Sequence, residues 1–185
     1  PTSIYLDTGE LADRHEQFCT RLDNYLKKRD LQSELELRYK LSGPVSKMIK
    51  KSFIERYSIR FEEVFASNDV LFSSRVWFYM DHFYVSEEII YVITRNFYSL
   101  TSDMSEKVYD IRLHEKIKYY NFLEIKLSHN DLKLLNVSFF DFLLKSLKYG
   151  LGKFFRVLKL VITNNLPLRD RRFLNFKEFY KLVYK

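Results

Sequence analysis

The sequence predicts an α/β fold, a mixed α+β domain in which helices flank a central mixed sheet. Two observations predict it: apolar residues recur at helical spacing over the first third of the chain, and β-branched and aromatic residues crowd together after Val70. Apolar residues make up 46% of the 185 residues, which suffices for a core and excludes wholesale disorder. No apolar run reaches the roughly 18 residues of a membrane-spanning helix. We therefore expect a single domain over residues 1–185.

The N-terminal part, residues 1–67, is expected to be mainly helical. Apolar residues separated by charged ones predict a helix within residues 9–40. Ser42, Gly43 and Pro44 break this pattern. A second helix is predicted over residues 45–66, where an apolar stripe resumes.

The remaining part, residues 68–185, is expected to hold the sheet and to end in a basic helix. A helix is predicted over 131–149, with Gly150 and Gly152 ending it, and another over 168–184. The other apolar segments are short and rich in β-branched or aromatic residues, or they alternate in polarity. We therefore expect strands at 75–80, 89–94, 108–114, 122–128 and 154–163.

Two of these predicted strands would bring carboxylates together. Asp110 lies on the polar face of the first strand, and Glu124 and Lys126 share the polar face of the next. Two convergent carboxylates repel each other, and a divalent cation relieves that repulsion. Oxygen ligands favour Mg²⁺ or Mn²⁺, which can activate a water molecule and polarise a phosphodiester.

In this pattern the sequence resembles the PD-(D/E)xK nuclease superfamily, which includes restriction endonucleases and viral cap-snatching endonucleases. The resemblance covers about 45–163 and implies a restriction-endonuclease-like core of a helix, three strands, a helix and a strand. Thirteen residues separate Asp110 from Glu124, and Tyr109 stands where the name motif has proline. The resemblance implies that Asp110 and Glu124 bind the metal and that Lys126 assists the attacking water.

Further metal ligands are also implied by the resemblance. Many members of the superfamily add an acidic residue from the first core helix, and both Glu62 and Glu63 are candidates. Cap-snatching members often add a helical histidine, for which His15 is a candidate. The resulting hypothesis is a metal-dependent endonuclease that hydrolyses RNA or DNA.

Positive charge is concentrated near the C-terminus. The chain carries a net charge of +7, and residues 144–185 hold 11 basic and 2 acidic residues. Such a segment favours a polyanionic partner, and we expect it to contact a nucleic-acid backbone. The candidate contacts are Lys145, Lys148, Arg169, Arg171, Arg172 and Lys177.

A non-enzymatic alternative stays open, in which the polar face of the sheet is simply solvated. The protein would then bind nucleic acid, a membrane surface or a host protein through its basic half. Lys145, Lys148, Arg156 and Lys159 would form a membrane-surface stripe if 138–162 were one helix. Gly150 and Gly152 interrupt that helix, and the β-branched residues at 161–163 favour a strand, so membrane contact is the less expected partner.

The cellular setting is inferred from cysteine usage and composition. The chain has one cysteine and no visible secretory signal, which favours an intracellular protein of the cytoplasm or nucleus. It has two alanines but 31 Phe and Tyr residues, a bias typical of an AT-rich genome, which could be viral, bacterial or protozoan. The choice between RNA and DNA, the oligomeric state, and whether the sequence is a whole protein or a piece of one stay open.

Overall fold

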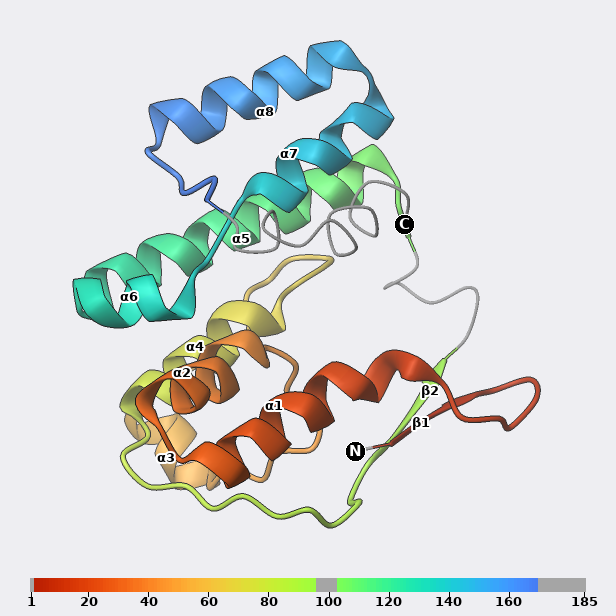
Figure 1. The fold of residues 1–185 in the computed structure, drawn as a ribbon, viewed down its shortest axis with the longest axis vertical. Coiled ribbons are helices and arrows are strands. Elements are labelled where there is room, and N and C mark those ends of the chain that lie inside the picture. Colours follow the sequence, from red (N-terminus) through yellow and green to blue (C-terminus); the bar gives the residue numbers. More distant parts are fainter. Residues whose placement is uncertain (1, 96–102, 170–185) are drawn as a thin grey trace. The chain divides into compact units, whose positions relative to one another are not determined.

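The computed structural model describes residues 2–95 and 103–169, and it is mostly helical with one small parallel sheet (Figure 1). The expected mixture of helix and strand is confirmed at this coarse level. The chain divides into two compact units, Pro1–Tyr119 and Tyr120–Lys185.

The sheet of the first unit has two strands from distant parts of the chain. Strand β1, Thr2–Tyr5, pairs in parallel with strand β2, Val92–Arg95, so that Ser3 lies opposite Ile93. The strand predicted at 89–94 is therefore confirmed in part. Within the described residues this is the only named sheet, so the expected larger central sheet is absent from them.

The helix predicted within 9–40 exists as two consecutive helices. Helix α1 spans Glu16–Lys28 and helix α2 spans Leu31–Lys40. Between them Arg29 adopts a left-handed backbone conformation with φ of 52°. The Asp30 side chain then accepts a hydrogen bond from the backbone N–H of Ser33 and caps α2.

The prediction of one long helix over 45–66 is wrong for most of its length. Helix α3 covers only Lys51–Arg56, and helix α4 follows at Asp69–Tyr79. Ile59 and two residues of α4, Phe72 and Val76, form a buried cluster, and hydrophobic side chains of α3 pack against it. The strand predicted at 75–80 is mostly helix, because α4 runs to Tyr79 and buries Phe72 and Val76 one turn apart.

Helix α5, Glu106–Lys126, replaces the predicted strands at 108–114 and 122–128. Val108, Tyr109, Leu113, Tyr119, Tyr120 and Leu123 are buried along it, a spacing that follows the helical period. The apparent alternation spans only seven residues at a time. The full segment contains neither glycine nor proline and continues the helical period for 21 residues.

In the described part of the second unit, short helices follow the end of α5. Helix α6 is His129–Leu135, helix α7 is Phe140–Ser146, and a 3₁₀ turn at Leu147–Tyr149 leads to helix α8, Leu151–Thr163. The prediction of helix over 131–149 is thus confirmed in pieces. The strand predicted at 154–163 is wrong, because Val157 and Val161 are buried at helical spacing on α8. The helix predicted over 168–184 lies almost entirely outside the described residues.

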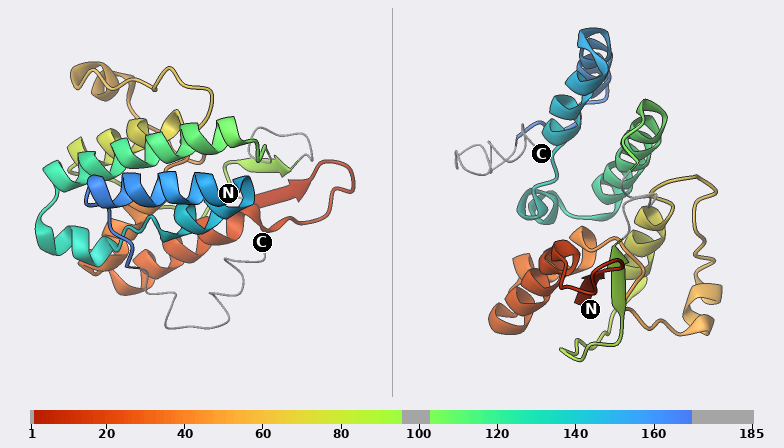
Figure 2. Two further views of the ribbon diagram at one scale, coloured as in Figure 1. Left: turned by 90° about the horizontal axis from the view of Figure 1, so that it is seen from above. Right: turned by 90° about the vertical axis from the view of Figure 1, so that its right-hand side faces the viewer.

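Helices α7 and α8 lie side by side, as both ribbon figures show (Figure 2). Gly150 makes the turn between them with φ of 96°, a backbone conformation that residues with a side chain rarely adopt. Its carbonyl then accepts from the N–H groups of Lys153 and Phe154, which begins α8.

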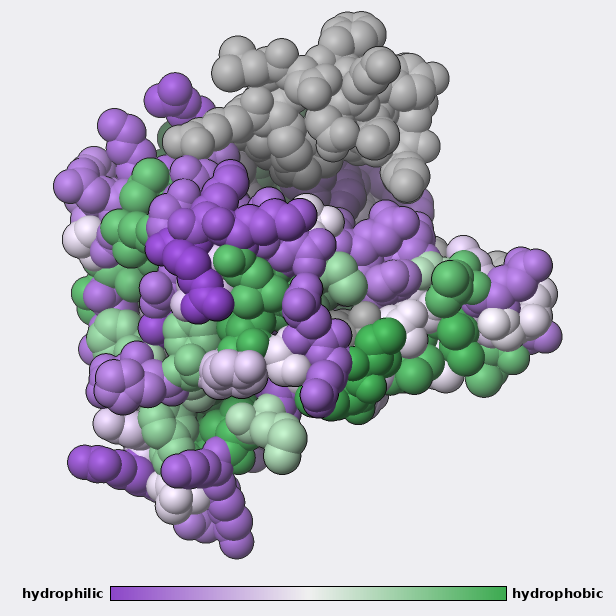
Figure 3. Space-filling model, turned by 60° about the horizontal axis from the view of Figure 1, so that its bottom comes forward, coloured by the Kyte–Doolittle hydropathy of each residue, from purple (hydrophilic) through white to green (hydrophobic). Residues whose placement is uncertain are grey.

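Hydrophobic side chains also reach the surface. Figure 3 shows hydrophobic patches between hydrophilic side chains on one face of the molecule. Tyr84 and Met48 of the first unit are 93% and 92% exposed. No helix of the described residues is long and apolar enough to cross a bilayer.

Candidate functional site

The three residues of the nuclease motif lie on one helix. Asp110 and Glu124 are both on α5, 14 positions apart, which corresponds to about 21 Å along the helix axis. One cation cannot bridge carboxylates at that separation, because metal–oxygen distances are about 2–2.6 Å. The residues therefore do not fit the metal that the resemblance implies. The strand pairing that was expected to bring them together is absent because α5 is continuous.

Glu124 has a partner of a different kind. The Tyr120 hydroxyl donates to Glu124 Oε1 over 3.3 Å, one helical turn away. Burial, reinforced by the nearby carboxylate, raises the pKa of Tyr120. Lys126 is exposed at the end of α5.

The additional ligand candidates are separated in the same way. Glu62 is engaged by Arg75 at 3.3 Å and by Lys118 at 3.4 Å, whereas Glu63 is exposed. His15 Nδ1 lies 2.8 Å from the Ser3 hydroxyl and joins the start of α1 to β1. Across residues 2–95 and 103–169, no three His, Cys, Asp or Glu side chains gather as a metal site would require.

Sequence reasoning missed a charge network in the first unit. Glu115 is 1% exposed, and its Oε1 accepts a hydrogen bond from Lys118 over 2.8 Å. Lys118 also reaches Glu62, and these carboxylates raise its pKa. The i, i+3 spacing of Glu115 and Lys118 would have indicated the pair once the segment was recognised as a helix. The network ties α5 to the segment that precedes α4.

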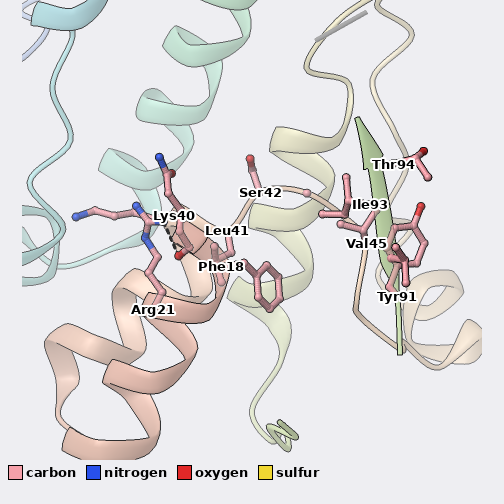
Figure 4. A pocket seen from close by; sticks show the side chains of 12 residues that line it. Phe18, Arg21, Lys40, Leu41, Ser42, Val45, Tyr91, Ile93 and Thr94 are labelled. Atoms are coloured by element: carbon pink, nitrogen blue, oxygen red, sulfur yellow. Dashed lines mark hydrogen bonds between the residues drawn. The ribbon is translucent and has the colours of Figure 1, made fainter. Parts of the chain in front are cut away.

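An open cavity of about 420 Å³ lies in the first unit beside α1, the 40–45 segment and β2 (Figure 4). Arg21 and Lys40 occupy one side of it, and Val45 and Ile93 the other. Both cations have protein partners: Lys40 pairs with Glu36 at 2.9 Å, and Arg21 donates to the Gln17 carbonyl over 3.1 Å. Because both cations already interact with groups of the protein, the cavity presents little positive charge for binding a ligand.

Lys47 stabilises the segment that lines this cavity. Its ammonium donates to the carbonyls of Leu41, over 2.6 Å, and of Gly43, and it lies 6.0 Å from the centre of the Trp77 ring. Burial lowers the pKa of Lys47 to about 8, and Asp69 opposes the shift. The Lys47 ammonium therefore stabilises this segment and loses its proton at a lower pH than an ordinary lysine does.

The strongest candidate surface lies on α8 in the second unit. Residues 144–169 contain six basic residues and no Asp or Glu. On α8 itself, Arg156 and Lys159 are exposed, whereas Lys153 is buried. Lys148 is exposed just before the helix. We call the exposed side chains of Lys148, Leu151, Phe155, Arg156, Lys159 and Ile162 the α8 surface.

The opposite side of α8 is fixed in place. Val157 and Val161 are buried, and the carbonyl of Val161 accepts from the N–H of Leu166 over 2.9 Å. The following residue, Pro167, accepts a hydrogen bond from Phe139 N–H over 2.8 Å. Because this side of α8 is packed, the exposed cations on its other side face the solvent.

The predicted nucleic-acid contacts are placed as follows. Lys145 is 47% exposed but pairs with Asp141 at 2.9 Å. Lys148 and Arg169 are exposed. Arg171, Arg172 and Lys177 lie outside the described residues. Arg156 and Lys159, which the sequence assigns to a membrane-surface stripe, are also exposed.

Comparison with known proteins gives no further guide. No family model, no curated protein and no solved structure matches the chain. No match bears on the resemblance to PD-(D/E)xK nucleases, which stays a prediction from the sequence.

Proposed function

We propose that the protein is a non-enzymatic interaction protein that binds polyanionic, phosphate-rich surfaces through the second unit. One observation carries the proposal: residues 144–169 present exposed cations with no carboxylate among them. A surface of one sign attracts the opposite charge over a Debye length of about 8–10 Å and raises the association rate.

The remaining described charges support this choice. Two cations of the first unit pair with nearby carboxylates, Lys40 with Glu36 and Lys118 with Glu115. Charge used in this way contributes to folding and little to long-range attraction. Residues 144–169 contain no Asp or Glu, and Lys148 and Lys159 are exposed in this segment.

The experiment measures retention of the intact chain on immobilised heparin, a generic polyanion. We expect Lys148→Glu/Lys159→Glu to elute at clearly lower salt than the wild type. The matched control is Lys50→Glu/Lys51→Glu, which makes the same change in net charge on exposed residues of the first unit. Equal losses in both variants would show that only net charge matters, and would overturn the proposal.

A second arm addresses the enzymatic alternative. The wild type is incubated with Mn²⁺ or Mg²⁺ and single-stranded RNA or DNA, and we expect no cleavage. Metal-dependent cleavage that disappears in both Asp110→Ala and Lys126→Ala would replace the non-enzymatic proposal with the nuclease.

A further inference from the structure

We propose that the polyanion recognised by the α8 surface is an anionic lipid bilayer, with α8 lying in the plane of the headgroups. This inference rests on the proposed function and names its partner. It depends on a second feature of α8, which is an exposed apolar stripe beside the cations.

The stripe is formed by three large side chains on one side of the helix. Leu151, Phe155 and Ile162 are 68%, 62% and 62% exposed. They stand four and seven positions apart, so they project from α8 in nearly the same direction. A monomer exposes isolated apolar residues routinely, but three large ones aligned along one side of a helix indicate an interaction face.

The cations border this stripe. At 100° per residue, Lys159 lies next to Phe155 around the helix, and Arg156 lies beyond Lys159. Both are exposed, and Lys148 is exposed just before the helix begins. An apolar row bordered along one side by Lys and Arg fits helices that insert their apolar side between lipid headgroups. Long cationic side chains then reach the lipid phosphates.

A bilayer fits this surface better than a nucleic acid does. A phosphate backbone would attract the cations but would leave Leu151 and Ile162 in water, since base stacking uses planar side chains. A bilayer uses both parts: anionic headgroups attract the cations, and the acyl boundary takes up the apolar row. Charge complementarity therefore selects an anionic surface, and the stripe selects lipid.

The test is co-sedimentation of the intact chain with vesicles of equal parts phosphatidylserine and phosphatidylcholine, and with phosphatidylcholine alone. We expect binding to the anionic vesicles, weakened by salt, and much weaker binding to the neutral ones. Phe155→Ser/Ile162→Ser is expected to lower the affinity about tenfold or more. Lys148→Glu/Lys159→Glu is expected to lower it about 25-fold or more.

The control for the apolar change comes from the first unit. Phe65 and Ile89 are 63% and 65% exposed, which matches Phe155 and Ile162 closely. Phe65→Ser/Ile89→Ser should bind vesicles as the wild type does. Equal losses in the two double variants would overturn the inference, because general surface hydrophobicity would then explain the binding.

The heparin experiment separates failure of this inference from failure of the proposed function. Phe155→Ser/Ile162→Ser should keep its heparin retention while losing vesicle binding. A wild type that binds heparin and single-stranded RNA but no vesicles would overturn the bilayer and leave the proposed function standing. A wild type that binds neither heparin nor vesicles would overturn both.

A direct probe reports on α8 without weakening the surface. Phe155→Trp places an indole in the stripe, in addition to the buried Trp77 that every variant shares. Its emission should shift to the blue with anionic vesicles and should be quenched by brominated lipid. Tyr84→Trp, at a residue that is 93% exposed in the first unit, should do neither. Equal quenching of both would contradict the orientation proposed for α8.

Discussion

Charged side chains are used differently in the first unit and in the segment 144–169. In the first unit they bind one another and the backbone: Arg38 contacts Glu34 at 2.7 Å and donates to the carbonyls of Trp77 and Met80 over 2.8 Å each. In segment 144–169, Lys145 pairs with Asp141, whereas Lys148 and Lys159 are exposed beside and on α8, whose packed side buries Val157 and Val161. Changing a charge should therefore cost stability in the first unit and binding in the second.

This difference separates the residues that maintain the fold from those available for a partner. The guanidinium of Arg38 also lies over the rings of Trp77 and Phe83. Both its charge and its N–H donors are therefore engaged within the fold. Lys159 is exposed on a helix whose other side is packed.

The largest effect should come from the apolar core of the second unit. Phe139 is 0% exposed and meets the Tyr120 ring edge-on at 5.8 Å between centroids. Phe139→Ala should lower the free energy of unfolding by about 3–5 kcal/mol. Phe155→Ala, at an exposed position of α8, should change it by less than about 0.5 kcal/mol. Urea denaturation followed by far-UV circular dichroism measures both, and similar losses would contradict a solvent-facing Phe155.

The Arg38 clamp should show the stabilising use of charge. Arg38→Met keeps an apolar stem but leaves the Trp77 and Met80 carbonyls without their donor, and should cost about 2–3 kcal/mol of unfolding free energy. Arg38→Lys keeps the charge but lacks the planar guanidinium, so its free energy of unfolding should lie between those of the wild type and Arg38→Met. Lys159→Met in the second unit serves as the control and should stay within about 0.5 kcal/mol of the wild type. A large loss of unfolding free energy in Lys159→Met would contradict the inferred difference between the two units.

The buried ion pair should respond asymmetrically to removal of each partner. Lys118→Met leaves the carboxylate of Glu115, which is 1% exposed, without its nearest cation. We expect a loss of about 2 kcal/mol, less than for a fully buried pair because Lys118 is 35% exposed. Glu115→Gln removes the buried charge while keeping the size, and should cost less than about 1 kcal/mol. Thermal unfolding at constant pH measures the pair, and equal costs would show that the buried charge is not what matters.

The same separation explains what could be predicted from sequence. The helical content of 9–40 and of 131–149 follows from apolar spacing, but the division of the first stretch into two helices at Arg29 was not predicted. Those signals are local, so they survive without knowledge of the tertiary structure. The basic character of segment 144–169 is likewise a property of composition.

The candidate site could not be predicted, because it depends on the choice between helix and strand. If residues 108–114 and 122–128 formed two paired strands, Asp110 and Glu124 could lie close together on one face. On α5 they lie about 21 Å apart along the helix axis. Short windows rich in Ile, Leu and Tyr fit both periods. On α8 the β-branched Val161 and Ile162 favoured a strand, yet burial of Val157 and Val161 on one side stabilises a helix. Packing decides such cases, and a single sequence does not display it.

Lys47 should make the stability of the first unit depend on alkaline pH. Its pKa is about 8 in the folded chain against 10.5 for a free lysine, so the unfolded state binds more protons between these values. Stability should therefore rise by about 1 kcal/mol between pH 7 and 9, and Lys47→Met should remove that rise. The window should end near pH 10, because burial raises the pKa of Tyr119 and its ionisation then favours unfolding. Urea midpoints at stepped pH give the measurement, and an unchanged slope in Lys47→Met would contradict it.

Two helix caps, one in each unit, give the smallest and sharpest contrast. The Asp30 carboxylate accepts from Ser33 N–H over 2.8 Å, and the Ser128 hydroxyl accepts from Asp131 N–H over 3.1 Å. Ser128→Ala should cost about 1 kcal/mol of unfolding free energy at any pH near or below neutrality. The Asp30 cap should titrate, because the hydrogen bonds from Ser33 lower the pKa of this carboxyl below 3.8. Its contribution is complete above pH 3.8 and is lost as the pH falls through the lower, folded-state pKa.

Asparagine separates the charge of the Asp30 cap from its geometry. Asp30→Asn keeps a capping oxygen but has no proton to gain, so this variant should lose less stability than the wild type between pH 5 and 3. The difference in unfolding midpoint between the two proteins should therefore narrow as the solution is acidified. For Ser128→Ala the corresponding difference from the wild type should stay constant over the same range. If the difference in unfolding midpoint between Asp30→Asn and the wild type stayed constant with pH, the Asp30 carboxylate would not cap α2 in solution. Charged side chains would then contribute less to the stability of the first unit than we infer.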